Sequence, residues 1–223
     1  MILTHYFPSL KENQTLPKRE LFKSFTEYTT LEQEAIATQL SCCSGRALCR
    51  FSQLDKYIER RNLTEQWLYA AFLKIGGRPL SPHPFYFVLG ENKQLKQDFG
   101  LNAGELILDT TQINKFDISF TLGDSVGLYF SSGQRQLYSL EEIETVSGNS
   151  TFVREQMALL EQHHHYIEAQ LWNKSYLSKA RIIKYYPVFI IYYITVYSHL
   201  LEYFYENQNL VKKWRYTRQI HRA

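Results

Sequence analysis

The sequence predicts an α+β fold, in which N-terminal helices pack on a mainly antiparallel sheet and an aromatic-rich helix follows at the C-terminus. Two patterns indicate this fold: apolar residues recur at helical spacing over residues 30–77, whereas short aromatic and β-branched runs dominate residues 84–172. With 44% apolar and 21% charged residues, a chain of 223 residues can bury a core and is too apolar for disorder. Three parts are therefore expected: an irregular arm over residues 1–29, a single α+β domain over residues 30–172, and an aromatic helix with a basic tail over residues 180–223.

The helical part is expected to begin at Thr30, which with Gln33 fits a capping box that satisfies free backbone amides at the start of a helix. This helix should run to about Cys43, because Gly45 breaks the pattern. Thr64 is expected to be the N-cap of a later helix. Helices are thus predicted over residues 30–43, 47–61 and 64–75.

Four runs in the second part of the chain predict strands. They are rich in aromatic and β-branched residues, which fit a half-buried pleated surface. These runs are residues 85–89, 105–108, 116–122 and 126–130. The last two flank Gly123-Asp124-Ser125, which is expected to form a turn. Two helices are predicted between the later strands, one opened by a capping box from Ser139 to Glu142 and one capped by Ser150 and ending near Gln162.

The cysteines predict a reducing compartment. Cys42, Cys43 and Cys49 fall in one predicted helical region, and an odd, clustered set forms no disulfide framework, so buried apolar thiols are expected. The first residues lack a basic stretch followed by a long apolar run, so no signal peptide is expected. A cytoplasmic location is therefore predicted.

Residues 185–205 form an aromatic segment that predicts a packed amphipathic helix. Thr195, Ser198, His199 and Glu202 fall along one polar stripe of such a helix. The length of the segment also suits a bilayer, so binding at a membrane interface and a membrane span are the alternatives.

The basic tail carries a noncatalytic hypothesis. Its positive charges dominate a chain whose formal net charge is +3, and Trp214 and Tyr216 lie among them. Basic residues bind phosphate, and aromatic residues stack on bases or settle at a membrane interface. Residues 185–223 are therefore expected to dock on nucleic acid or on a membrane surface if this part of the chain carries the function. The charges are Lys212, Lys213, Arg215, Arg218 and Arg222.

The run from His163 to His165 precedes a short alternating segment. In a strand the three imidazoles point to alternate sides and cannot converge on one ion, so no metal site is predicted. The same alternation places Glu168 and Gln170 on one face between Tyr166 and Trp172. An acid and an amide between two aromatic rings predict a ligand cleft. Glu168 is its candidate catalytic residue, stabilising positive charge or holding a ligand hydroxyl, and Tyr166 and Gln170 are candidate substrate-binding residues.

Two further loops supply candidate residues. The loop before the first strong strand contains Arg78, whose guanidinium can bind a phosphate or a carboxylate, and His83, a candidate acid or base. Ser125 lies in the turn expected after a strand in which Ser119 and Thr121 share one face, which suggests a polar ligand-binding loop. The sequence thus predicts a small enzyme with a cleft built from Arg78, His83, Ser125 and Glu168, acting on a phosphate-containing substrate. These residues alone do not identify a cofactor or an oligomeric state.

The order of these residues resembles the Arg, Ser-Thr and Glu pattern of ADP-ribosyltransferases. The resemblance covers about residues 78–172, with Arg78 before the first strand, Ser119 and Thr121 in the middle strand and Glu168 in a late strand. In that family the arginine binds NAD, the middle strand supports the pocket and the glutamate acts on the ribose. The resemblance therefore implies NAD as the candidate cofactor and transfer of ADP-ribose as the reaction. The family's usual arrangement puts the essential glutamate last, whereas here Gln170 follows Glu168.

A metal-dependent nuclease is the rival enzyme hypothesis. Asp109 and Asp117 precede Glu168, and clustered carboxylates can hold magnesium. Such sites commonly add a lysine that stabilises charge on phosphate, and Gln170 occupies that place here.

Overall fold

The computed structural model describes residues 1–8, 23–41, 46–100, 103–131, 135–148 and 166–183, all within a compact unit spanning Met1–Tyr185. The helix predicted over residues 150–162, the histidine run, the aromatic segment and the basic tail lie outside the described residues. Cys42 and Cys43 lie outside them as well, and the thiol of Cys49 is exposed rather than buried.

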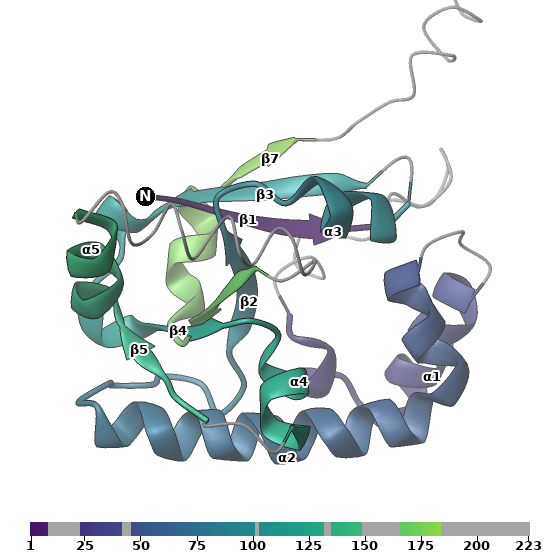
Figure 1. The fold of residues 1–223 in the computed structure, drawn as a ribbon. Coiled ribbons are helices and arrows are strands. Elements are labelled where there is room, and N and C mark those ends of the chain that lie inside the picture. Colours follow the sequence, from purple (N-terminus) through teal and green to yellow (C-terminus); the bar gives the residue numbers. More distant parts are fainter. Residues whose placement is uncertain (9–22, 42–45, 101–102, 132–134, 149–165, 184–223) are drawn as a thin grey trace, which may run out of the picture. The chain divides into compact units, whose positions relative to one another are not determined.

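The described residues form a seven-stranded sheet in which every pair of neighbouring strands is antiparallel (Figure 1). The α+β class and the mainly antiparallel sheet predicted from the sequence are confirmed. The order across the sheet is β5-β4-β6-β2-β1-β3-β7. The strands are β1 (Ile2–Phe7), β2 (Phe85–Leu89), β3 (Gly104–Asp109), β4 (Ile118–Leu122), β5 (Tyr138–Ser139), β6 (Ile167–Leu171) and β7 (Arg181–Ile183).

Helices occur both before and after Phe85, where β2 begins. The α-helices are α1 (Thr30–Ser41), α2 (Leu54–Lys74), α3 (Lys93–Asp98), α4 (Ser125–Phe130) and α5 (Leu140–Gly148). The 3₁₀ helices are η2 (Phe25–Glu27), η3 (Arg46–Gln53), η4 (Thr110–Gln112), η5 (Lys115–Asp117) and η6 (Lys174–Lys179).

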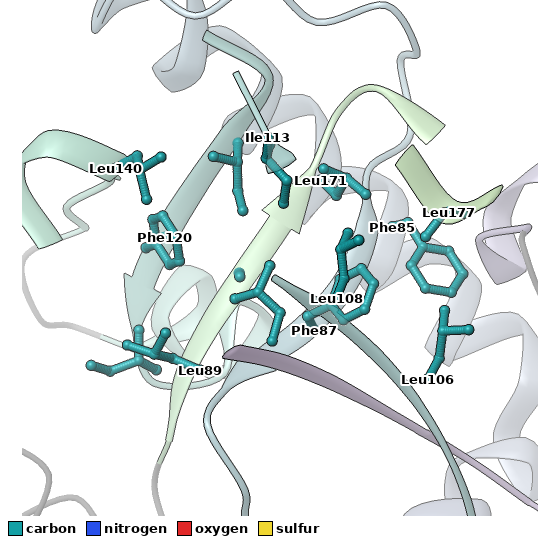
Figure 2. Packing of buried hydrophobic residues seen from close by; sticks show 14 of the residues in the cluster. Phe85, Phe87, Leu89, Leu106, Leu108, Ile113, Phe120, Leu140, Leu171 and Leu177 are labelled. Carbon is teal, nitrogen blue, oxygen red and sulfur yellow. The ribbon is translucent and has the colours of Figure 1, made fainter. Parts of the chain in front are cut away.

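The two faces of the sheet differ in polarity because successive side chains of a strand point to opposite sides. In β6, Ile167, Ala169 and Leu171 belong to the main hydrophobic core, which also takes side chains from β2, β3, α5 and η6 (Figure 2). Glu168 and Gln170 alternate with them and therefore lie on the opposite face, as the sequence predicted. Both are buried, so this second face is polar but covered.

Helix α2 covers part of the polar face (Figure 1). Its Leu68 and Phe72 pack with Trp172, whose ring stacks on Phe72 at 5.2 Å between centroids. Arg61, two turns earlier on the same helix, lies over the Tyr86 ring of β2. The contacts of α2 therefore place its first half over the strands that carry Glu168 and Tyr86.

The largest correction to the sequence prediction concerns the N-terminus. Residues 2–7 were expected to belong to an irregular arm, but they form β1, which lies between β2 and β3. Leu3 and Phe7 are buried in the main core. The sheet also includes β7, so it extends beyond residues 30–172 on both sides.

Two local predictions are also corrected. The strand predicted over residues 126–130 is helix α4, because the Asp124 side chain accepts a hydrogen bond from Gly127 N and so acts as a helix N-cap rather than a turn residue. Thr64, the expected N-cap, lies within α2 and its hydroxyl donates to the Arg60 carbonyl. The helix boundary predicted at Thr64 does not exist, because α2 continues through this residue.

Of the two predicted capping boxes, one is displaced and one is confirmed. Thr29 rather than Thr30 is the N-cap of α1, and it exchanges hydrogen bonds with Glu32. Ser139 and Glu142 form the second box at the start of α5, as predicted.

Gly104→Ala is expected to destabilise the sheet. A Cβ atom at Gly104 would lie 2.4 Å from two ring carbons of Phe7, which is buried, so β1 and β3 would have to move apart. Such overpacking costs about 1–3 kcal/mol, which thermal unfolding would register as a fall in Tm of several degrees. Gly127→Ala is the control, because its Cβ would meet nothing closer than 3.3 Å and alanine favours a helix. Equal Tm values for the two variants would contradict the prediction.

Candidate functional site

Strands β1 and β2 diverge in the middle of the sheet. Among the described residues they pair at two positions, Leu3 with Leu89 and Thr4 with Val88. From there β1 continues along β3, whereas β2 continues along β6. At the point of divergence the ring nitrogen Nδ1 of His5 lies 2.7 Å from the carbonyl oxygen of Tyr86, so the side chain replaces a backbone partner that β1 no longer provides.

A cavity of about 230 Å³ lies at this divergence. Residues of β1, β2 and β6 line it from the sheet, and residues of η2, α1, η3, α2 and α3 line it from the helical part. Eleven of the lining residues are phenylalanine or tyrosine. The charged lining residues are Lys23, Arg50, Arg61, Asp124 and Glu168. The cavity therefore suits a ligand that has flat rings and groups of both charges.

Glu168 is the buried carboxyl group of this cavity, with only 4% of the residue exposed. Burial raises its pKa to about 7, and the nearby Asp124 adds to the rise, while Arg61 and hydrogen bonds act in the opposite direction. A carboxyl group with a pKa near neutral pH can act as either an acid or a base, and such groups are concentrated at functional sites.

A chain of buried hydrogen bonds between side chains of β4, β6 and Trp172 leads to the Glu168 carboxylate. The Trp172 ring N–H donates to the Ser119 hydroxyl (2.9 Å), which in turn donates to the side-chain oxygen of Gln170 (3.0 Å). The amide nitrogen of Gln170 then donates to the Thr121 hydroxyl and to Glu168 Oε1, both at 3.1 Å. Every group in this chain has its donor and acceptor roles fixed by its neighbours, so the Glu168 carboxylate is a pre-positioned acceptor.

Arg61 stands beside Glu168 on the wall contributed by α2. Its guanidinium lies 3.7 Å from the centroid of the Tyr86 ring, and its Nε is 3.6 Å from Glu65 Oε1. Burial opposes its charge, but the surrounding tyrosines, Glu168 and Glu65 together raise the pKa of Arg61 well above its ordinary value. A permanent cation therefore faces the cavity.

His5 is a site residue that the sequence reasoning missed. Burial lowers the pKa of His5 to about 4, so the imidazole is neutral. A carbonyl oxygen can only accept, so the contact with Tyr86 assigns the proton to Nδ1 and leaves Nε2 as an acceptor. The signal available in the sequence was a lone histidine inside the apolar run ILTHYF, which becomes visible only if that run is assigned as a strand.

Arg50 was also missed. Its guanidinium lies 5.5 Å from the Tyr57 ring centroid, 5.7 Å from Phe99 and 5.9 Å from Phe51, so aromatic rings surround it on the helical side of the cavity. An arginine among rings binds anionic groups with its donors and supports flat groups with its plane.

The predicted site residues divide into two groups. Tyr166 and Glu168 line the cavity, and Gln170 supports Glu168. The buried hydroxyl of Ser125 lies near enough to lower the pKa of Glu168, although within the described residues it makes no hydrogen bond of regular geometry. Four of the predicted residues are therefore brought together.

Arg78 and His83 lie elsewhere than the cavity lining. The Arg78 guanidinium packs on the Phe116 ring at 4.6 Å, and its backbone N–H donates to the Phe116 carbonyl. The Nδ1 atom of His83 lies 2.6 Å from Glu65 Oε2. The two arginines at the cavity come from α2 and η3 instead of the loop before β2, and the third cation, Lys23, precedes η2.

The carboxylates of the nuclease hypothesis are not brought together either. Asp109 accepts a hydrogen bond from Thr111 N, and Asp117 accepts from the Tyr176 hydroxyl and the Asn173 amide. Neither aspartate is a lining residue of the cavity that contains Glu168. Within the described ranges, no three His, Cys, Asp or Glu side chains are grouped so that they could hold a metal ion.

Comparison of the chain with protein-family models, with curated proteins and with solved structures gives no match. In the part of the chain that the structure describes, no helix combines the length and the hydropathy that crossing a bilayer requires.

Proposed function

We propose that this chain transfers ADP-ribose from NAD to an acceptor nucleophile, with Glu168 acting at the reacting ribose. The observation that carries the proposal is the buried Glu168 carboxylate in an aromatic cavity that the cation of Arg61 and the neutral imidazole of His5 also line. Each of these groups has a counterpart in the chemistry of a dinucleotide.

The cavity lining matches the parts of NAD. Aromatic walls accept flat rings, Arg50 and Lys23 supply positive charge for a diphosphate, and Glu168 and His5 Nε2 are acceptors for ribose hydroxyls. A volume of about 230 Å³ lies below the range of about 300–1,000 Å³ that is typical of sites for whole drug-sized ligands. The enclosed part therefore fits one nucleoside half of NAD, and the other half extends outward.

Glu168 acts on the charge that develops in the transfer. The bond between ribose C1′ and the nicotinamide nitrogen breaks, and its electron pair goes to that nitrogen, so nicotinamide leaves as a neutral molecule. C1′ becomes electron-deficient, and the acceptor nucleophile forms the new bond to it and then loses its proton to solvent. The ionised Glu168 carboxylate stabilises the positive ribose, which requires the charge to be pre-positioned by Gln170 rather than gathered during the reaction.

The rate of nicotinamide release should rise with pH. Only ionised Glu168 stabilises positive charge, and the pKa of this group is about 7. We therefore expect kcat/KM to rise about tenfold per pH unit below 7 and to flatten above it, measured by nicotinamide release between pH 5.5 and 8.5. Glu105→Gln is the matched control and should keep the acid limb of the profile. Glu105 is also buried in the sheet, but it pairs with Lys96 outside the cavity. A profile without this acid limb would contradict the role of Glu168.

Binding is tested separately from turnover by the thermal stability of the purified chain with NAD, short nucleic acids or anionic vesicles. A ligand that binds only the folded state raises Tm, and NAD is expected to do so. A rise with nucleic acid or vesicles and none with NAD would overturn the transferase proposal and favour docking through residues 185–223.

A further inference from the structure

Glu65 is a buried carboxylate that the proposed reaction does not use. Only 2% of the residue is exposed, and it lies one turn after Arg61 on α2. It is not among the residues that line the cavity. A buried carboxylate next to a site is costly unless several partners satisfy it, so its contacts indicate what it does.

The two oxygens of Glu65 bind different parts of the molecule. Oε1 accepts a hydrogen bond from the Tyr86 hydroxyl (3.0 Å) and faces Arg61 Nε at 3.6 Å, and both partners line the cavity. Oε2 accepts from the Thr26 hydroxyl (2.8 Å) and lies 2.6 Å from Nδ1 of His83. One carboxylate thus joins two cavity residues to η2 and to the loop before β2.

Arg61 has two candidate anionic partners and is paired with one of them. It is within ion-pair distance of Glu65 at 3.6 Å, and the tyrosine ring beneath it fixes the plane of the guanidinium. Among the ion pairs of the described residues, none joins Arg61 to Glu168. Glu168 therefore keeps a carboxylate that is hydrogen-bonded by Gln170 but not neutralised by a contacting cation.

We propose that Glu65 is a positioning residue, which holds Arg61 over the Tyr86 ring and away from an ion pair with Glu168. The Glu168 carboxylate then remains available to a ligand in the cavity. This inference rests on the proposed function for its biological meaning, but its geometry can be tested without NAD.

His83 is the partly exposed partner of Glu65. Its side chain is 31% exposed. The hydrogen bond to Glu65 raises the pKa of His83 and burial opposes this rise. The charge of Glu27 also raises this pKa, whereas the charge of Lys174 lowers it. When His83 is protonated, its charge offsets part of the Glu65 charge. His83, expected from the sequence as a catalytic acid or base, contacts Glu65 and does not line the cavity.

The groups that face Glu168 determine what release of Arg61 would do. Arg61 comes from α2, Asp124 and Ser125 from the start of α4, and Gln170 from β6 itself. The hydroxyl groups of Tyr86 on β2 and of Tyr166, just before β6, also interact electrostatically with Glu168. Of these, only Arg61 is a cation. A full ion pair lowers the pKa of a carboxyl group by about 1–3 units.

The test is the titration of the Glu168 carboxyl carbon by NMR in the full chain, assigned with Glu168→Gln and measured without ligand. Glu65→Gln is expected to lower the Glu168 pKa by about 1 unit or more, because Arg61 then pairs with Glu168. His83→Gln, at a partly exposed position that does not threaten folding, is expected to leave the pKa unchanged or raise it slightly.

A double-mutant cycle separates repositioning of Arg61 from simple loss of a distant charge. In an Arg61→Met background, Glu65→Gln is expected to leave the Glu168 pKa unchanged. A fall of equal size with and without Arg61 would overturn the proposal, and so would no fall in the wild-type background or a fall in His83→Gln.

Activity supplies the second arm of the test. If the chain releases nicotinamide from NAD, Glu65→Gln should move the acid limb of kcat/KM to lower pH and should lower kcat, because Arg61 now occupies the carboxylate. Absence of any turnover in the wild-type chain would count against the proposed function alone, since the NMR titration decides the role of Glu65 independently.

Discussion

Glu168→Gln is expected to release nicotinamide from NAD about 10²- to 10³-fold more slowly than the wild-type chain, as is typical when a pre-positioned electrostatic group is removed. Glutamine keeps the shape of the side chain and can still accept the hydrogen bond from Gln170. What it lacks is the negative charge that the reacting ribose requires. The measurement is nicotinamide release at pH 8, where the wild-type carboxyl group, with a pKa of about 7, is largely ionised.

The same variant should be more stable than the wild type at pH 8. The folded pKa of Glu168 is about 7 and its ordinary value is 4.5, so the unfolded chain ionises first and the folded state loses stability as pH rises from 4.5 to 7. This loss amounts to about 3 kcal/mol above pH 7, and glutamine avoids it because it cannot ionise. At about pH 4.5 the two chains should differ little.

Glu105→Gln distinguishes this effect from removal of any buried carboxylate. Glu105 is 2.9 Å from Lys96, so its replacement removes an ion pair and should give no gain in Tm at pH 8. A Glu168→Gln chain that melts below the wild type at pH 8 would show that the carboxylate stabilises the fold, which contradicts the role assigned to it.

Trp172→Ala is expected to cause the largest loss of stability in the sheet. The indole has no exposed surface and donates to Ser119. It stacks on the Phe72 ring with 5.2 Å between centroids and meets the Tyr69 ring in an edge-to-face arrangement with 5.9 Å between centroids. Truncation of such a side chain costs about 3–5 kcal/mol, equivalent to a fall in Tm of about 10 °C or more for a chain of this size. Thermal denaturation measures it.

Trp172→Phe is the matched variant for this position. It keeps a ring against Phe72 but loses the donor to Ser119, so its loss of Tm should be smaller. Equal stability of the alanine and phenylalanine variants would contradict the packing argument.

Strand β6 shows what the sequence could predict. Its alternation assigned Ile167 and Ala169 to one face and Glu168 and Gln170 to the other, because the two-residue period of a strand is a local property. The α+β class followed in the same way from changes of period along the chain.

The rest depended on contacts between distant residues. β1 was missed because its partners, β2 and β3, begin at Phe85 and Gly104, and nothing local distinguishes His5 in a strand from His5 in an arm. Arg61 was missed and Arg78 was predicted for a similar reason. Its position before a strand suggested a ligand-binding loop, but Arg61 reaches the cavity because α2 runs on past Thr64 and lies over Tyr86.

The place of β6 in the sheet has a consequence for how the chain assembles the cavity during folding. In the order β5-β4-β6-β2-β1-β3-β7, β6 is the strand that joins the β5-β4 pair to the other four strands. It is also the strand that carries Glu168, and it comes after β1 to β5 in the chain. A growing or partly folded chain without β6 therefore has two separate pieces of sheet and lacks the Glu168 carboxylate at the cavity. Addition of β6 therefore joins the two pieces of sheet and brings Glu168 to the cavity in one step, so under the proposed function a folding intermediate without β6 would be inactive.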